Sequence, residues 1–558
     1  MVNAPPVKTV IYILRDDDFC LVTTNLRTHQ KLLNDINNKI NSLGMKIKPS
    51  KCRSFSIRSG SPEAIHFNLA DYQIPSIAEE EQKYLGRLLF FNMKPKEAFK
   101  LLKEKLKEKL ENLDSTEIRN EFKVKIYKEY LLPSIRFLLT VHEIQSGDLD
   151  SLDVFTDQFL KKWCGLARCA TRMVLHCPTA LDIPSVSALY REAHTVAHVT
   201  ARLKADIEVQ DALNNKLERE REIVKWNPII VQAEQMYEQA MQANAPLGQT
   251  PTDLHQFNLE GVGAMEVPPD APKSPLFIEK VKDTAKAYVR GDETADMHEK
   301  AKTLISQGRF LDLSLQEKCD ATWKSYIYNL SKGTMKWILN STVNSLPTLS
   351  NLKTWGKAAS DKCKLCGWKQ TLKHITSGCR KALNQGRFTF RHDNILAYIA
   401  DSLDRSKCDF YIDIPDHQTA AAGTVPPSLT VTNLKPDVVI IGKNRQYAGI
   451  FELTVPNEEN IEERHNYKAN KYSHFENEIS LPTVLVEPFE IGANTGYINA
   501  RNKITIKKIH AFVKPNISLK SFTNNLSAIS VLSSYYVYQA RNQQDWVSPG
   551  RVHPPLKK

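Results

Sequence analysis

Three cysteines and one histidine lie close together in the chain at the spacing C-x2-C-x7-H-x4-C. They are Cys363, Cys366, His374 and Cys379. A C-x2-C pair on a tight turn points two thiolates at one position, and the other two side chains flank one helical turn. Four such nitrogen and sulfur donors form the tetrahedral set that Zn²⁺ prefers, and they leave no position open for water. The spacing therefore predicts a structural zinc site rather than a catalytic one.

Two other interpretations of the cysteines remain. The first is coincidence, with core cysteines and a surface histidine that share no ion. The second places a metal at a different set of residues: Cys164, Cys169, His176 and Cys177. An adjacent histidine and cysteine cannot easily point at one ion, so this second set is better explained as helix core. The spacing favours a metal site at Cys363, Cys366, His374 and Cys379 over both of these interpretations.

Two acidic residues form a second candidate site. Asp437 opens the β-type run "DVVII", and Glu452 lies in the next such run, with fourteen residues between them. That separation is long enough for a hairpin, so neighbouring strands are expected to place both carboxylates side by side at the end of a sheet. Such a pair supplies the oxygen ligands that Mg²⁺ prefers. Bound Mg²⁺ can activate water and stabilise the charge that develops on a phosphodiester.

The helix predicted after this pair has one face that points inward. Its members step by four and three residues: Ile461, His465, Lys468, Tyr472 and Phe475. A lysine on such a face needs an anionic partner, and the Asp437–Glu452 pair provides one for Lys468. Lys471 is the alternative. The competing interpretation is an ordinary amphipathic helix with exposed acids and a lysine whose amine reaches water.

Composition limits the classes of protein to which the chain can belong. The 558 residues include 75 Lys and Arg against 63 Asp and Glu, a net charge of +12. This surplus favours a polyanionic partner, although over such a length it also fits an ordinary solvated surface.

No apolar run is long enough to span a membrane, and the N-terminus lacks the order of a signal peptide. Ten mostly scattered cysteines indicate a reducing compartment, so we expect an intracellular protein.

The elements that must position these residues follow from periodicity. A hairpin with aspartates at its tip is predicted at 8–22, and a helix follows that ends near Gly44. Short strands are expected at 54–58 and 83–91, and mostly helical patterns follow them. A Pro- and Gly-rich stretch at 243–276 indicates a linker. After the cysteines, we expect a helix at "RFTFRHDNILAYIADSL", strands at "PDVVII" and "AGIFELTV", and a helix over 458–478.

The order of these segments resembles the C-terminal half of the reverse transcriptase of non-LTR retrotransposons that carry a restriction-like endonuclease. The resemblance rests on "KYLGRLLFF", "KKWCGLARCATRMVLHCPTALDIPSVSALY", "WILNSTVNSLPTLSNLKTWG", the Cys-Cys-His-Cys loop, "RHDNI", "KPDVVI", "FELT" and "RHNYKANKY". It implies an α+β multidomain fold. The implied domains are a partial polymerase palm at 1–94, a helical thumb at 95–242, the linker at 243–276, a helical connector at 277–360, a zinc knuckle at 361–382 and an α/β restriction-endonuclease-like domain at 383–558.

The resemblance also assigns roles in the nuclease. It implies that Asp437 and Glu452 are the metal ligands and that Lys468 is the catalytic lysine, displaced from the usual Glu-x-Lys place, where this chain has Thr454.

Further residues are expected to contact nucleic acid. The resemblance implies that Arg391 and His392 contact DNA. The knuckle lysines, Lys364 and Lys373 among them, offer phosphate contacts.

The polymerase hairpin departs from the family pattern. Asp17 and Asp18 fall at the paired aspartates, but Arg15 and Asp16 occupy the places of an aromatic residue and an alanine. Polymerisation also needs a third carboxylate from an earlier strand, and the chain begins about a dozen residues before the hairpin. We therefore expect no polymerase activity from this chain by itself.

The two acids and the lysine are consistent with a Mg²⁺-dependent endonuclease, and the resemblance implies that it nicks DNA to prime reverse transcription. Its implied partners are a DNA target and the element RNA, with no membrane and no small-molecule substrate, and the resemblance implies a nuclear location. The alternative is a decayed, non-catalytic, zinc-containing nucleic-acid-binding protein. The truncated palm and the altered "RDDD" favour this alternative, and the intact Asp437, Glu452 and Lys468 weigh against it.

Overall fold

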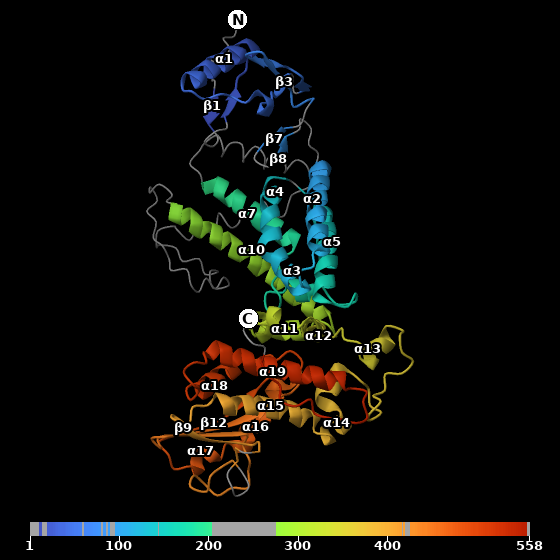
Figure 1. The fold of residues 1–558 in the computed structure, drawn as a ribbon, viewed down its shortest axis with the longest axis vertical. Helices are drawn as coiled ribbons and strands as arrows, with labels where there is room; N and C mark the ends of the chain where they lie inside the picture. Colours follow the sequence, from blue (N-terminus) through green and yellow to red (C-terminus); the bar gives the residue numbers. More distant parts are fainter. Residues whose placement is uncertain are drawn as a thin grey trace, which may run out of the picture. The chain divides into compact units, whose positions relative to one another are not determined.

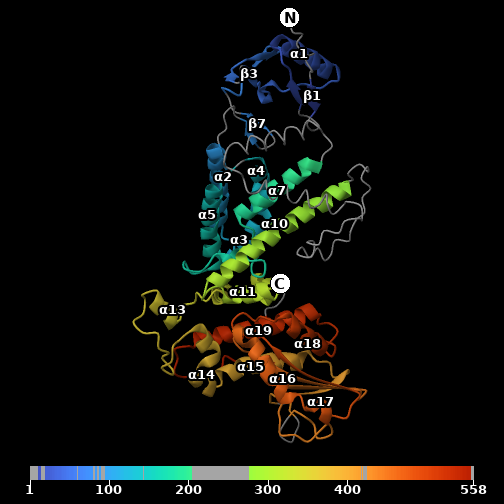
Figure 2. The same cartoon turned by 180° about the vertical axis from the view of Figure 1, so that it is seen from behind.

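The protein has a mixed α+β fold that is mostly helical (Figures 1 and 2). The computed structural model describes residues 10–13, 19–58, 61–79, 82–84, 87–89, 95–142, 144–203, 275–415, 417–418 and 424–554. The chain divides into two compact units: unit 1 comprises Met1–Leu106 and Ile135–Asp148, and unit 2 comprises Lys107–Ser134 and Leu149–Lys558. Each unit is described by itself.

Unit 1 contains small hairpins and one long helix. Its strand pairs are β1 (Val10–Ile13) with β2 (Phe19–Val22), β3 (Ser56–Arg58) with β4 (Ser61–Glu63), β5 (Phe67–Leu69) with β6 (Tyr72–Ile74), and β7 (Gln82–Tyr84) with β8 (Arg87–Leu89), all antiparallel. The helices are α1 (Leu26–Ser42) and the short η1 (Pro49–Lys51). Leu33 of α1 packs on Phe67, Leu69 and Ile74 in a small core.

The sequence predicted the first hairpin and the helix after it. β1 and β2 pair as expected, with Val10 opposite Val22. Their connection, which carries Asp17 and Asp18, lies outside the described residues. α1 begins after Asn25, whose side chain accepts hydrogen bonds from two backbone N–H groups, and Gly44 follows its end with φ +74°.

The first part of unit 2 is a group of helices. The elements of this part of the chain are α2 (Pro95–Ser115), α3 (Asn120–Ile126), η2 (Tyr127–Leu131), α4 (Leu132–Val141), α5 (Ser146–Cys164), α6 (Met173–His176), α7 (Val186–Leu203), α10 (Pro275–Thr303), α11 (Arg309–Gln316), η4 (Thr322–Ser325), η5 (Ile327–Asn329), α12 (Lys332–Thr342) and α13 (Leu349–Thr354). Of these, α2, α4 and α5 contribute residues to both units. α7 and α10 lie side by side in both views (Figures 1 and 2). The predicted linker at 243–276 falls almost wholly outside the described residues.

The C-terminal part of unit 2 contains one four-stranded sheet and the helices that cover it. Its elements are η6 (His374–Gly378), α14 (Arg380–Asn384), α15 (Arg387–Ser402), β9 (Cys408–Ile412), β10 (Val438–Gly442), β11 (Tyr447–Thr454), η7 (Glu458–Asn460), α16 (Ile461–Tyr472), α17 (Phe475–Glu478), β12 (Thr483–Glu490), α18 (Ala500–His510) and α19 (Leu519–Gln539). The strand order is β12-β11-β10-β9. β9, β10 and β11 are antiparallel in turn, whereas β11 and β12 run parallel.

Helices cover both faces of this sheet (Figure 1). Side chains from α15, α18 and α19 pack on Val438, Ile440 and Phe451 on one face. α16 and α17 pack on the other face, against Val439 and Ile450. Because side chains alternate along a strand, Asp437 and Glu452 belong to the face covered by α16.

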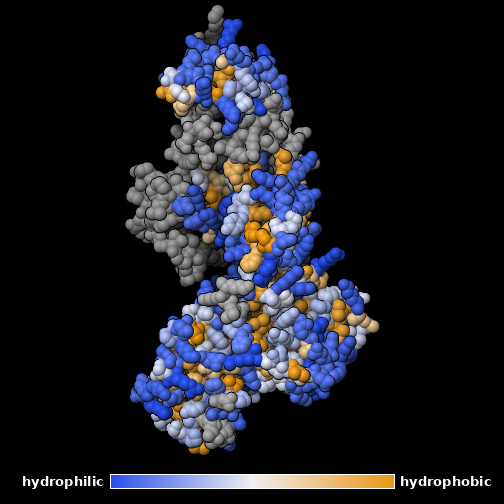
Figure 3. Space-filling view, viewed as in Figure 1, coloured by the Kyte–Doolittle hydropathy of each residue, from blue (hydrophilic) through white to orange (hydrophobic). Residues whose placement is uncertain are grey.

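The surface of the described residues is mainly polar on the face seen in Figure 3, with scattered hydrophobic side chains. Among the described helices, none combines the length and the apolar character that crossing a bilayer requires.

Candidate functional site

The structure places Asp437 and Glu452 side by side. Val438 is opposite Phe451 in the β10–β11 ladder, so Asp437, one residue earlier, is opposite Glu452. The backbone N–H of Asp437 donates to Glu452 Oε2 at 3.1 Å, and the backbone N–H of Leu453 donates to Asp437 Oδ2 at 2.7 Å. Both side chains are buried, at 6% and 5% exposed. Two carboxylates are therefore held together at the end of one strand pair, as the sequence predicted.

Burial and like charge affect this pair. Burial raises the pKa of Glu452, Asp437 raises it further, and the ammonium group of Lys468 opposes both. Two buried carboxylates that share one position repel each other when both are ionised. A cation at this position relieves that repulsion.

The structure distinguishes Lys468 from Lys471. Lys468 on α16 forms an ion pair with Glu452 through Nζ and Oε1. The amine of Lys471 is instead 2.9 Å from the hydroxyl of Tyr472, and it lies over the Tyr472 ring at 4.6 Å from the centroid. The predicted inward face of α16 is confirmed, and of these two lysines Lys468 is the one that reaches the carboxylates.

His392 was predicted as a DNA contact, but no sequence pattern indicated its position beside Asp437. Its Nε2 is 3.3 Å from Asp437 Oδ2, and its Nδ1 is 3.2 Å from Asp393 Oδ1. Burial alone would lower the pKa of His392, but the charge of Asp437 and the hydrogen bond with Asp393 outweigh it and raise this pKa to about 10. A cationic imidazolium therefore lies against the carboxylate pair.

Asp413 is a carboxylate near the pair that the sequence reasoning missed. It directly follows β9, and its backbone N–H donates to the carbonyl of Asp437 at 2.9 Å. Burial raises the pKa of Asp413, and the charge of Asp437 raises it further. The available signal was an acidic residue immediately after the alternating run "CDFYI".

Arg391 is buried, and this placement corrects the expectation that it contacts DNA. It is 2% exposed, and it donates through Nη1 to the carbonyl of Thr376 at 2.8 Å and through Nη2 to the carbonyl of Val455 at 2.9 Å. Burial lowers its pKa to about 10, while the charge of Glu458 opposes this effect. Its guanidinium joins the segment before Cys379 to the end of β11, so contact with DNA would break these bonds.

We expect Arg391→Met to destabilise the protein by about 2–4 kcal/mol, because it leaves buried carbonyls without a donor. Urea unfolding measures this change. Arg405→Met removes an exposed guanidinium that lies over the ring of Phe410, so it serves as the control and should change the free energy of unfolding by less than about 0.5 kcal/mol. Equal effects of the two substitutions would contradict a structural role for Arg391.

The four predicted metal ligands converge. The donor atoms of Cys363, Cys366, His374 and Cys379 all lie within 4.8 Å of one another. Cys366 Sγ is 3.3 Å from His374 Nε2 and 3.7 Å from Cys379 Sγ. Gly367 follows the Cys-x2-Cys turn with φ +77°, a conformation that glycine adopts without strain. The set can hold a metal ion such as zinc, and the described residues contain no other cluster of three or more such ligands.

The surroundings shift the pKa values of the individual ligands in different directions. Burial raises the pKa of Cys363, but backbone N–H groups of Leu365 and Cys366 donate to its sulfur and leave this pKa below its usual value. Burial and the neighbouring sulfurs raise the pKa of Cys379 to about 11. Burial lowers the pKa of His374, which favours the neutral imidazole that binds metals. Thiolates this close together repel one another, and a bound cation would relieve that repulsion.

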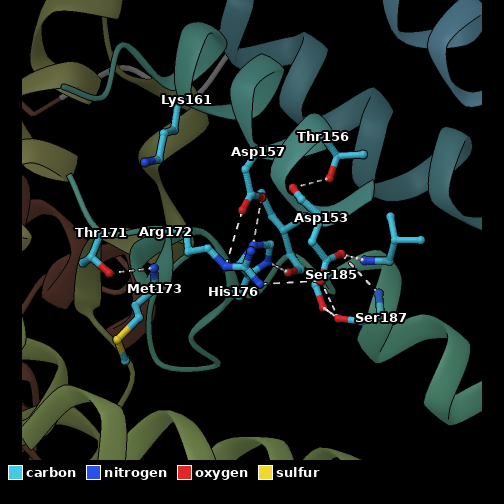
Figure 4. Close-up of polar contacts among 12 residues, drawn as sticks. Asp153, Thr156, Asp157, Lys161, Thr171, Arg172, Met173, His176, Ser185 and Ser187 are labelled. Atoms are coloured by element: carbon cyan, nitrogen blue, oxygen red, sulfur yellow. Dashed lines mark hydrogen bonds and ion pairs between the residues drawn. The ribbon is translucent and has the colours of Figure 1, made fainter. Parts of the chain in front are cut away.

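In the described part of the chain, the second cysteine set does not form a metal-ligand group. His176 Nε2 is 2.9 Å from Asp157 Oδ1 (Figure 4), and its Nδ1 is 2.8 Å from the carbonyl of Ile183. Arg172 lies within 3.5 Å of carboxylate oxygens of both Asp153 and Asp157 on α5. Both ring nitrogens of this histidine are therefore engaged by protein oxygens. The remaining members divide between core and surface: Cys164 and Cys177 are buried, and Cys169 is exposed.

The two predicted knuckle lysines differ in their surroundings. Lys373 is 3.0 Å from Asn460 Oδ1 and 3.6 Å from Glu459 Oε2, so it links the knuckle to η7. Lys364 is exposed.

No protein-family model matches the chain, and no curated protein matches its sequence.

Proposed function

We propose that the C-terminal part of this chain is a Mg²⁺-dependent DNA endonuclease. The observation that carries this proposal is the convergence of Asp437, which directly precedes β10, with Glu452 of β11 and Lys468 of α16. The three side chains match the composition of nuclease sites that use two acids and one lysine. The four-stranded sheet with helices on both faces supplies a rigid base for them.

Each side chain has a separate task in this proposal. Asp437 and Glu452 would hold Mg²⁺, and a bound Mg²⁺ would supply a more acidic water and positive charge to offset that of the phosphate. Lys468 balances the charge of Glu452 and presents its amine to the phosphate that is cleaved. His392 holds Asp437 in place from the side of α15 and adds a positive charge beside the DNA backbone.

The broader role follows from the retrotransposon resemblance and is proposed with it. The nuclease nicks a chromosomal strand, and the new 3′ end primes copying of element RNA by a polymerase. DNA and element RNA are the partners, and the nucleus is the location. Zinc in the knuckle stiffens the segment just before the nuclease sheet.

The direct test incubates the purified full chain with supercoiled plasmid, with Mg²⁺ or with EDTA. We expect conversion to the open-circular form only when Mg²⁺ is present. Plasmid that stays supercoiled at every Mg²⁺ concentration would rule out the nuclease.

A second function is favoured by the charge on the knuckle: a non-catalytic nucleic-acid-binding protein. Lys362, Lys364, Lys369, Arg380 and Lys381 are all exposed. Binding that falls steeply with salt, without any Mg²⁺-dependent nicking, would select this function.

The two lysines of α16 provide a matched pair of variants. Lys468→Met should lower the rate of nicking about 100- to 1,000-fold, because it removes a cation that faces the carboxylates and the phosphate. Lys471→Met should keep the rate of nicking within about 3-fold of the wild-type rate, because the amine that it removes is directed at Tyr472. Single-turnover nicking at saturating Mg²⁺ measures both. A larger loss in the Lys471 variant would reverse the assignment.

A further inference from the structure

Trp368 lies in the metal-binding loop with its side chain in solvent. Of the tryptophans in the described part of the chain, Trp163, Trp323 and Trp337 are buried and two are partly buried, whereas Trp368 is 64% exposed. Exposing an indole forgoes the large stabilisation that burying it would give. Single exposed apolar side chains are ordinary on protein surfaces, so it is the neighbours of this ring that indicate a contact surface.

The loop fixes the position of this ring. The backbone N–H of Cys363 donates to the carbonyl of Trp368 at 2.6 Å, and Lys362 pairs with Lys369 in a β-bridge on either side of the turn. Arg380, which directly follows Cys379, places its guanidinium over the indole ring at 5.8 Å from the centroid. Arg380 is thus adjacent to one predicted ligand, and Trp368 lies two residues after another, Cys366.

The surroundings of the ring are strongly basic. Residues 361–386 contain six lysines and arginines and a single acid, Asp361. That acid is 3.4 Å from Lys353. All six cations are exposed. An aromatic face among cations matches the two parts of single-stranded nucleic acid, an unpaired base and its phosphates.

We propose that Trp368 and Arg380 form a stacking platform for an unpaired base of single-stranded nucleic acid, while Lys362, Lys364 and Lys369 contact the neighbouring phosphates. Duplex DNA cannot use this platform, because its bases are stacked on one another. The surface is separate from the carboxylate pair, and binding is measured without Mg²⁺, so failure of the nuclease would leave this proposal standing.

The test adds the full chain to fluorescently labelled nucleic acids of about 12 nucleotides and measures the anisotropy of the label. The three nucleic acids are oligo-dT, oligo-U and a DNA duplex. Trp368→Ala should weaken binding to a single strand about 10-fold and change duplex binding by less than about 2-fold. Trp368→Phe keeps an aromatic face and should retain affinity within about 3-fold. The comparison of oligo-dT with oligo-U shows whether the single strand is DNA or RNA.

Two controls separate stacking from misfolding. Bound zinc should be equal in the wild type and in Trp368→Ala, because the substitution keeps the backbone carbonyl that bonds to Cys363. Tyr130→Ala removes a 69% exposed aromatic residue of η2 and should leave binding unchanged. Equal loss on duplex and single strand, or no loss in Trp368→Ala with normal zinc content, would overturn the platform.

Discussion

Asp437→Asn is expected to lower Mg²⁺-dependent nicking roughly 1,000-fold, corresponding to about 4 kcal/mol of lost transition-state stabilisation. The substitution keeps the size of the side chain and an oxygen that can accept from the N–H of Leu453. It removes the negative charge that holds the cation and that attracts His392. Time courses of plasmid nicking across a range of Mg²⁺ concentrations measure the loss.

A matched control lies at the opposite end of the same strands. Asp409 on β9 pairs with Lys443, at the turn that joins β10 and β11. Asp409→Asn should nick plasmid at a rate within about 2-fold of wild type. It changes the net charge of the domain by the same amount as Asp437→Asn, but at the other end of the sheet from Asp437 and Glu452. DNA binding of both variants in EDTA should be unchanged. Nicking by Asp437→Asn at the wild-type rate would remove Asp437 from the site and with it the proposed chemistry.

The central part of this site could be predicted because it depends on local patterns. Two apolar runs separated by a short connection predict a hairpin, and the spacing of Ile461, Lys468 and Tyr472 predicts the inward face of α16. The side chain that the sequence could not place is His392. It precedes Asp437 by more than forty residues, and only the packing of α15 on the sheet brings the two together.

The missed elements depend on long-range contacts. β12 contains a proline and two glutamates, and it pairs in parallel with β11 across the whole α16–α17 connection. α19 is rich in serine, which has little helix propensity, yet Ser527, Ser530, Ser533 and Ser534 are completely buried. Tertiary packing rather than propensity therefore stabilises this helix. The predicted helix over 458–478 is three shorter elements, because local periodicity does not fix their boundaries.

The second large expected effect concerns the zinc site, where Cys379→Ser should abolish stoichiometric zinc binding and destabilise the C-terminal part of unit 2. The wild-type chain should carry about one zinc ion, and loss of one thiolate from a closed tetrahedral set removes most of the affinity. We expect a loss of about 3 kcal/mol, which lowers the midpoint of thermal unfolding by roughly 6–12 °C. Atomic absorption and calorimetry measure the two quantities.

The effect should extend beyond the loop because the loop is bonded to the rest of the domain. Gln370 donates to Asn542 Oδ1 at 3.0 Å, just after α19. Arg387, which is 1% exposed, donates to the carbonyls of Ala540 and Gln543 and lies over the ring of Trp546. The metal-binding loop and the start of α15 are therefore both bonded to the segment that directly follows α19. Those two helices pack on each other, and both contribute to the core on the sheet.

Cys169→Ser is the control for this prediction, because Cys169 is exposed and lies outside the ligand set. Zinc content and unfolding midpoint should match the wild type. Chelation of the wild-type chain should reproduce the Cys379→Ser midpoint, and added zinc should restore the wild-type value but not that of the variant. If chelation left the midpoint unchanged, the loop would be stable without metal. In that case the crowded sulfurs would have to be protonated thiols, and the sheet that carries Asp437 and Glu452 would not depend on zinc.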